Sequence, residues 1–88
     1  MTRHYVVGGR VQGVGFRDFV RRLARGHGVR GWVRNREDGR VEAVATADPE
    51  ALEKFEADLR AGSRVSRIES VDTADLEETP FTEFEIRR

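Results

Sequence analysis

The spacing of apolar residues alternates between two periods along this chain, and the order of that alternation limits the fold more than any other feature. Short runs rich in β-branched and aromatic residues have the composition of strands. Between them lie two stretches whose apolar residues recur every three to four positions, as on one face of a helix. In chain order the segments predict strand, helix, strand, strand, helix, strand. An antiparallel sheet that carries both helices on one face accommodates this order.

The pattern predicts an α+β fold, the ferredoxin-like split β-α-β (βαββαβ) sandwich, as a single domain over residues 1–88 with a short extra strand at the C-terminus. We expect the third strand to lie between the first and the second, which are then parallel to each other. We expect one helix to begin near Phe16 and end at Gly26-His27-Gly28, and another to run from Asp48-Pro49 to Gly62. The expected strands span residues 4–8, 29–35, 40–46, a segment centred on 67–73, and 81–87.

The amino-acid composition excludes several kinds of functional site. The chain has no cysteine, which excludes disulfides, iron–sulfur clusters and thiol nucleophiles. Its two histidines have no neighbouring ligand pattern, so we expect neither a metal site nor a cofactor. No apolar run approaches the roughly 20 residues that span a bilayer, and Met1-Thr2-Arg3 leads into a strand without a secretory apolar region. These features predict a cytoplasmic protein with no membrane partner.

Charge is distributed unevenly, although the formal net charge is zero. Residues 1–40 contain ten arginines and three acidic residues, a net charge of +7, whereas residues 41–88 contain six basic and thirteen acidic residues, a net charge of −7. Such polarity can concentrate an anionic ligand over one part of the surface.

A glycine-rich segment joins the first strand to the first helix, and it has features of an anion site. Gly13 and Gly15 permit a tight turn that brings backbone N–H groups close to a ligand, and the positive end of the helix points to the same place. Arg17 adds a guanidinium whose donors match phosphate oxygens. The run from Gly9 to Phe16 therefore has the features of an anion cradle, with Arg17 beside it as a phosphate clamp.

Spacing alone favours a different interpretation, in which the segment is an ordinary connection that carries a solvated arginine. The segment is not a Walker A motif, because no Gly-Lys-Ser/Thr follows, and the dinucleotide-binding pattern fails at Asp18.

Asn35 ends the second strand and is the other candidate for the site. Because the first two strands are predicted to be parallel, their C-terminal ends share one edge of the sheet, about 10 Å apart across the intervening strand. A carboxamide there can accept a hydrogen bond from water and donate one to a phosphate oxygen. The alternative is that Asn35 only favours the turn that follows it.

The residue set limits the chemistry that such a site can support. The sequence offers no Ser-His, Cys-His or paired-carboxylate arrangement, so water is the remaining nucleophile. Without a titrating acid, the leaving group must depart unprotonated. A carboxylate does so readily because its conjugate acid has a pKa of about 4. A mixed carboxylic–phosphoric anhydride therefore fits this site, and a phosphate monoester does not.

Two motifs, Gly9-Arg10-Val11-Gln12-Gly13-Val14-Gly15-Phe16-Arg17 and Gly31-Trp32-Val33-Arg34-Asn35, together with the element order and the terminal Phe-x-Ile strand, closely resemble acylphosphatase, a family of small enzymes that hydrolyse acyl phosphates. The likeness covers nearly the whole chain. It implies that Arg17 binds the substrate, that Asn35 orients the attacking water and that residues 11–16 form the phosphate loop. It also implies a metal-free monomer that takes a small-molecule acyl phosphate and releases inorganic phosphate.

Two alternative functions share the topology: an RNA-binding module and a small-ligand regulatory domain. The RNA-binding module needs stacking aromatic residues on its two central strands, and Val41-Glu42-Ala43-Val44-Ala45 offers none. The regulatory domain is normally attached to an enzyme, and this sequence shows no second domain. We therefore expect no nucleic-acid partner.

Overall fold

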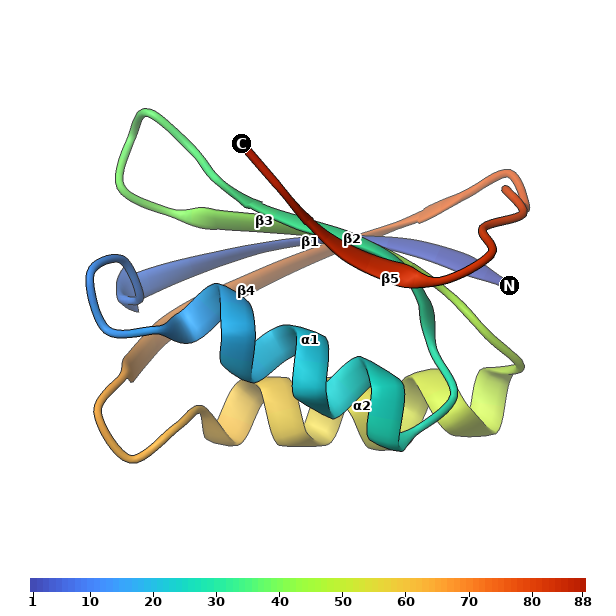
Figure 1. Cartoon of the computed structure of the whole chain (residues 1–88), viewed down its shortest axis with the longest axis horizontal. Helices are drawn as coiled ribbons and strands as arrows, with labels where there is room; N and C mark the ends of the chain where they lie inside the picture. Colours follow the sequence, from blue (N-terminus) through green and yellow to red (C-terminus); the bar gives the residue numbers. More distant parts are fainter.

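The computed structural model describes residues 1–88, and its elements follow the predicted order (Figure 1). The elements are β1 (Thr2–Arg10), α1 (Phe16–Gly26), β2 (Arg30–Asn35), β3 (Val41–Thr46), α2 (Pro49–Ala61), β4 (Arg67–Leu76) and β5 (Phe84–Arg87). The α+β, ferredoxin-like prediction is confirmed.

The five strands form one sheet in the order β4-β1-β3-β2-β5. β3 pairs antiparallel with both β1 and β2, so β1 and β2 run parallel and β3 lies between them, as predicted. β4 pairs antiparallel with β1 at one edge. At the other edge β5 pairs parallel with β2, from Gly31↔Phe84 to Arg34↔Arg87. The expected antiparallel sheet therefore describes four strands, and the C-terminal strand makes the whole sheet mixed.

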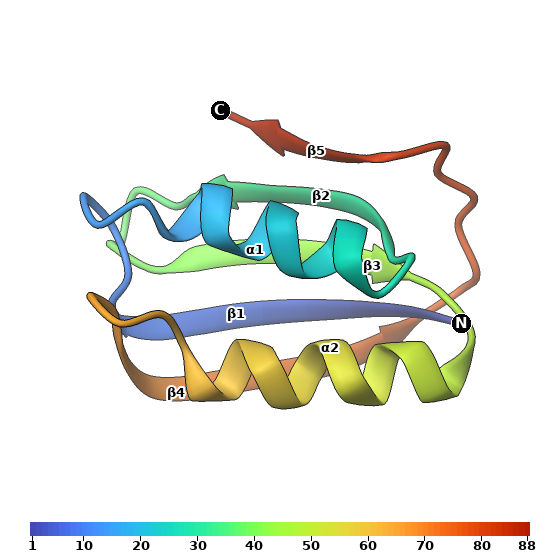
Figure 2. The ribbon, with the colours of Figure 1, turned by 60° about the horizontal axis from the view of Figure 1, so that its bottom comes forward.

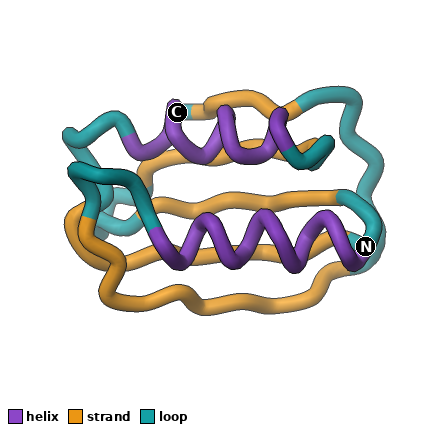
Figure 3. Tube along the Cα trace, turned by 90° about the horizontal axis from the view of Figure 1, so that it is seen from below, coloured by secondary structure: helices purple, strands orange, loops and turns teal.

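Both helices cover the same face of the sheet, and the core lies between the two layers (Figures 1 and 2). Seen from below, α1 and α2 lie side by side and run along the strands (Figure 3). Three buried aromatic rings tie the layers together. The Tyr5 ring from β1 meets Phe55 of α2 edge-on with centroids 5.8 Å apart, and Phe55 lies 6.3 Å from Phe84 of β5.

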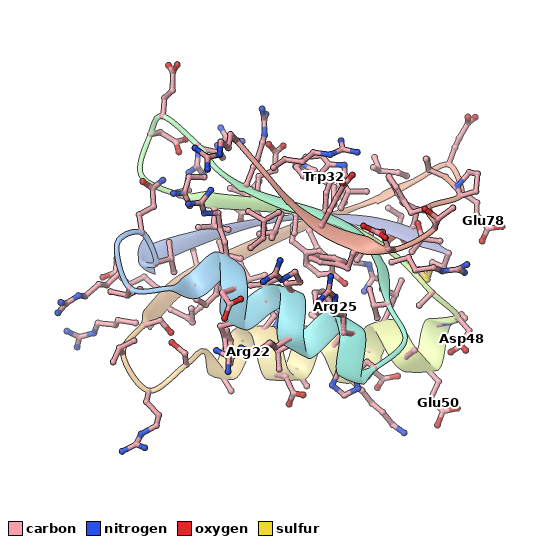
Figure 4. All side chains as sticks on the ribbon, in the orientation of Figure 1. Arg22, Arg25, Trp32, Asp48, Glu50 and Glu78 are labelled. Carbon is pink, nitrogen blue, oxygen red and sulfur yellow. The ribbon has the colours of Figure 1, made fainter.

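The two helices begin differently. α2 has the cap that its sequence predicts: the Asp48 carboxylate accepts a hydrogen bond from the Ala51 N–H at 2.9 Å, and Pro49 opens the helix (Figure 4). α1 begins after Gly15, which has no side chain, so no side-chain cap exists there. The first-turn N–H groups of α1 are therefore left without the partner that Asp48 supplies to α2.

Strand lengths differ from the prediction at both ends of the chain. β1 extends from Thr2 to Arg10 because it is a central strand: β4 pairs with it over that whole range, and polar residues are held in the ladder. β5 begins at Phe84 instead of residue 81, and only the Glu83 carbonyl continues the pairing, by accepting from the Gly31 N–H. Backbone pairing with β3 and β4 thus extends β1 beyond the apolar residues from which it was predicted.

Two side chains lie in places that their local sequence did not specify. His27, expected only as part of the Gly26-His27-Gly28 end of the first helix, lies 2.7 Å from Asp58 of α2 through Nε2 and Oδ2, and so joins the two helices. Trp32 lies half-buried on the open face of the sheet (Figure 4), with the guanidinium carbons of Arg34 and Arg87 5.6 and 5.2 Å from its ring centroid. Neither helix is long and apolar enough to cross a bilayer.

Candidate active site

Three connections gather at one end of the molecule (Figures 1 and 2): residues 11–15 between β1 and α1, residues 36–40 between β2 and β3, and residues 62–66 between α2 and β4. The parallel arrangement of β1 and β2 causes this, because both strands point their C-terminal ends to the same edge. The two sequence segments that carry the candidate residues therefore meet.

A cavity of about 220 Å³ lies where they meet. Arg17 and Asn35, which are 18 positions apart in the sequence, both line it. Four of the six predicted loop residues also contribute to its wall. The lining residues are Val11, Gly13, Gly15, Phe16, Arg17, Asp18, Asn35 and Ile86.

The loop has the left-handed backbone that the glycines were expected to supply. Gly13 has φ 74° and Gly15 has φ 71°, a region in which a side chain is strained, and nothing lies within 4 Å of the Cβ that either would carry. Phe16 and Val11 are buried on either side and fix the loop to the core. Since Gly15 leaves α1 uncapped, the N–H groups of its first turn remain available at this cavity, where an anion would satisfy them.

The Arg17 guanidinium is not neutralised by any acidic side chain of the chain. Its one hydrogen bond runs from Nη1 to the Arg87 carbonyl of β5, and at 3.4 Å it is long. This contact orients the side chain over the cavity and leaves most of its donors free. An anion in the cavity would therefore meet both the helix terminus and an uncompensated positive charge.

The Asn35 carbonyl oxygen, Oδ1, is buried and has no hydrogen-bond partner. Leaving a buried acceptor unpaired costs about 1–3 kcal/mol, so an unpaired carboxamide oxygen beside an anion site indicates a place for a bound donor. Water is a donor of suitable size. A donor bound at this oxygen would give Asn35 a role beyond the turn after β2.

Gln12 and Val14, the other two predicted loop residues, direct their side chains away from the cavity. The Gln12 amide donates to the Arg36 carbonyl at 2.8 Å and to the Arg40 carbonyl at 3.0 Å, which ties the loop to the β2–β3 turn directly after Asn35. Val14 lines a neighbouring groove. Only their backbone groups can serve as part of an anion cradle.

Sequence reasoning missed the contributions of Asp18 and of β5. Asp18 lines the cavity, but its carboxylate is bound by Arg21 Nη2 at 2.8 Å and Arg22 Nε at 3.1 Å, which directs it along α1. Ile86 and the Arg87 carbonyl enter the site because β5 pairs with β2, a pairing for which the sequence carries no local signal. The ion pairs of Asp18 could have been predicted, because Arg21 and Arg22 follow it at the i, i+3 and i, i+4 spacings that bring side chains together on a helix.

In the turn after Asn35, Arg36 and Arg40 form ion pairs with Asp38. Asp38 receives hydrogen bonds from the side chain and backbone N–H of Arg40 and from Arg36, and these hold the pKa of its carboxyl well below the usual value. Asp38 therefore stays ionised at neutral pH and organises the turn. No three His, Asp or Glu side chains gather in the chain in a way that could hold a metal ion.

Comparisons with known proteins show which family the chain belongs to. A family model described as acylphosphatase matches residues 3–86. An acylphosphatase of Koribacter versatilis is 48% identical over 97% of this chain and 78% of its own length, and one of Deinococcus radiodurans is 46% identical over 92% and 93%. The crystal structure of acylphosphatase from Bacillus subtilis superposes with a TM-score of 0.95 at 36% identity, covering 99% of this chain and 98% of that one.

A matched pair of glycine substitutions tests whether the loop backbone forms the anion site. Gly15→Ala should destabilise the fold by about 1–2 kcal/mol because Gly15 has a left-handed φ, and it should weaken binding of inorganic phosphate by shifting the loop. Gly26→Ala, in the last turn of α1 where nothing obstructs a Cβ, should stabilise by about 0.5–1 kcal/mol. Urea unfolding and phosphate titration calorimetry measure both effects.

If Gly15→Ala folds less stably but binds phosphate as the unsubstituted protein does, the loop is not the anion site.

Proposed function

The chain belongs to the acylphosphatase family and is an acylphosphatase, and we propose that the cavity between the loop of residues 11–16 and Asn35 is where it hydrolyses the carboxyl–phosphate bond of an acyl phosphate. The products are a carboxylate and inorganic phosphate. The observation that carries this assignment is the pairing, in one small cavity, of an uncapped helix terminus beside Arg17 with the buried, unpartnered Asn35 oxygen.

The loop and Arg17 would hold the phosphoryl group. Backbone N–H groups of residues 11–16 and the first turn of α1 donate to the phosphoryl oxygens, and the guanidinium donates a further pair in its fixed fork. The charge on the three peripheral oxygens persists through the transition state, so these contacts bind the substrate and also stabilise the reaction.

Asn35 would position the nucleophile. Its Oδ1 accepts a hydrogen bond from water, its amide nitrogen can donate one to a phosphoryl oxygen, and the water oxygen is thereby directed toward phosphorus. The P–O bond to the acyl group breaks in line with the attack, its electron pair leaves on the carboxylate, and the water's proton ends on the phosphate product. No step requires a side chain that gains or loses a proton. The one carboxylate that lines the cavity, Asp18, is paired with Arg21 and Arg22 and has no part in this mechanism.

The alternative RNA-binding function would use the open face of the sheet, and the residues there do not favour it. Glu42 stands at the centre of that face on β3, with Arg34 Nε 2.6 Å from its Oε1 and His4 Nε2 2.6 Å from its Oε2. A central carboxylate repels phosphate, and Trp32 is the one Phe, Tyr or Trp side chain that the strands place on that face. We propose no nucleic-acid partner. The monomeric state, the absence of a cofactor and the cytoplasmic location stay predictions.

Phosphate release from benzoyl phosphate, assayed with and without a chelator, tests the proposed mechanism. We expect equal rates because positioning by the loop, Arg17 and Asn35 supplies the catalysis without a metal ion. Loss of activity in chelator, with recovery on addition of a divalent cation, would contradict a metal-free site.

Substitutions at Arg17 and Asn35 should separate binding from water activation. Arg17→Ala should raise KM and lower kcat, and Arg17→Lys should recover little, because an ammonium cannot reproduce the bidentate fork. Asn35→Ala should lower kcat by about 10²–10³-fold while KM and phosphate affinity change little, since the water is bound most strongly in the transition state.

Unfolding midpoints serve as the control for these variants. Both side chains are partly exposed, so the variants should remain folded. A folded Asn35→Ala variant with unchanged kcat would leave Asn35 as a turn residue only and would refute its assigned role.

A further inference from the structure

A groove of about 420 Å³ adjoins the phosphate cavity on the outer side of the loop. Gly15 lines both spaces, so they share a wall. The connections that form the groove lie at the same end of the molecule (Figures 1 and 2). Its walls are formed by Val14 and Gly15 of the loop, Phe19 and Arg22 of α1, and Arg64 and Val65 of the α2–β4 connection.

The groove exposes apolar surface to solvent. Val65 is 60% exposed, and Leu76, at the opposite end of the sheet, is the other large apolar side chain that is left exposed. Val14 and Phe19 pack against the core with one side and line the groove with the other. An exposed valine outside the core cluster, beside two further apolar side chains and the proposed reaction site, forms a surface suited to an apolar ligand.

The groove also carries positive charge. Arg22 is paired with Asp18, whereas Arg64 takes part in none of the ion pairs within the chain. Arg22 lies nearer than Arg25 to the loop end of α1 (Figure 4). The surface thus combines an apolar wall with a guanidinium that is free to bind an anion.

The direction of the reaction decides which neighbouring space can receive the acyl half of the substrate. The attacking and leaving oxygens lie roughly in line through phosphorus, so the acyl group points away from the water that Asn35 would hold. A second, wider depression is lined by Arg34, Asn35 and Arg36, and it lies on the water's side. No residue of β2 or β5 lines the groove, which lies on the other side of the loop from Asn35.

We propose that this groove is the acyl-group subsite, with Val14, Phe19 and Val65 contacting an apolar acyl body and Arg64 favouring a negative charge at its far end. The inference rests on the proposed function, because it takes the phosphoryl group to lie in the loop. The preferred substrates are then acyl phosphates that have an apolar stem and a distal anionic group, rather than the shortest acyl phosphates.

Three acyl phosphates test the subsite: acetyl phosphate, benzoyl phosphate and 4-carboxybenzoyl phosphate. Acetyl phosphate is too short to fill the groove, the benzoyl ring contacts its apolar wall, and the distal carboxylate reaches its charge. Val65→Ser should lower kcat/KM for benzoyl phosphate about 3–10-fold more than for acetyl phosphate, as partial burial of one branched side chain implies. Arg64→Ala should lower the ratio of 4-carboxybenzoyl to benzoyl kcat/KM about two- to fivefold, and added salt should shrink that effect.

Matched controls come from exposed positions outside the groove. Leu76→Ser removes the other exposed apolar side chain, and Arg25→Ala removes the same charge from a more distant turn of α1. Both should keep the unsubstituted substrate ratios. Melting temperatures confirm that Val65→Ser and Arg64→Ala remain folded, as expected for exposed positions.

The outcomes separate this inference from the proposed function. If the unsubstituted protein hydrolyses all three compounds and the groove variants leave their ratios unchanged, the acyl subsite is wrong and the phosphate site stands. If the controls alter the ratios as much as the groove variants do, the subsite is likewise wrong. If none of the three compounds is hydrolysed, the proposed function fails and the subsite fails with it.

Discussion

The left-handed backbone at Gly13 and Gly15 is the constraint on which the site depends. It lets the chain leave the central strand β1 and enter α1 within five residues, and it starts the helix without a side-chain cap. An aspartate in the position of Asp48 of α2 would satisfy the first-turn N–H groups internally and place a negative charge where an anion must bind. The glycine loop keeps those donors unpaired. The buried Val11 and Phe16 and the two hydrogen bonds of Gln12 then hold the open loop in place.

The position of Asn35 relative to the loop is set by the strand order of the sheet. β3 separates β1 from β2, so the loop and Asn35 face each other across one strand rather than touching. That separation leaves room for a phosphoryl group and a water, and Gln12 closes the gap at the side by bonding the turn after Asn35. The asparagine oxygen is buried without a hydrogen-bond partner. In the function that we propose, the attacking water pairs with this oxygen, and the cost of an unpaired buried acceptor is then part of a preorganised site.

Much of this arrangement could be predicted from the sequence, because it follows from local signals. The apolar stripe of α1 and the Asp-Pro start of α2 give the element order, and the parallel relation of β1 and β2 then brings Arg17 and Asn35 together. The features that could not be predicted depend on contacts between residues far apart in the sequence. The sequence of β5 does not say that it pairs parallel with β2 and so supplies Ile86 and the Arg87 carbonyl to the site. Nor does the Gln12 side chain, predicted as part of the loop, reveal that it bonds carbonyls 24 and 28 residues away. The groove beside Val65 likewise arises where two distant connections meet.

The central claim is that the loop and Arg17 hold the phosphoryl group while Asn35 holds the attacking water. A crystal structure with orthovanadate, whose five-coordinate form imitates the phosphoryl-transfer transition state, tests it most directly. The account predicts vanadium in the loop, with its three equatorial oxygens bonded to backbone N–H groups of residues 11–16 and to Arg17. One axial oxygen should lie about 3 Å from the Asn35 carboxamide, and the other should point toward the Val65 groove. Vanadate bound outside the loop, or bound there with neither axial oxygen in contact with Asn35, would contradict the account.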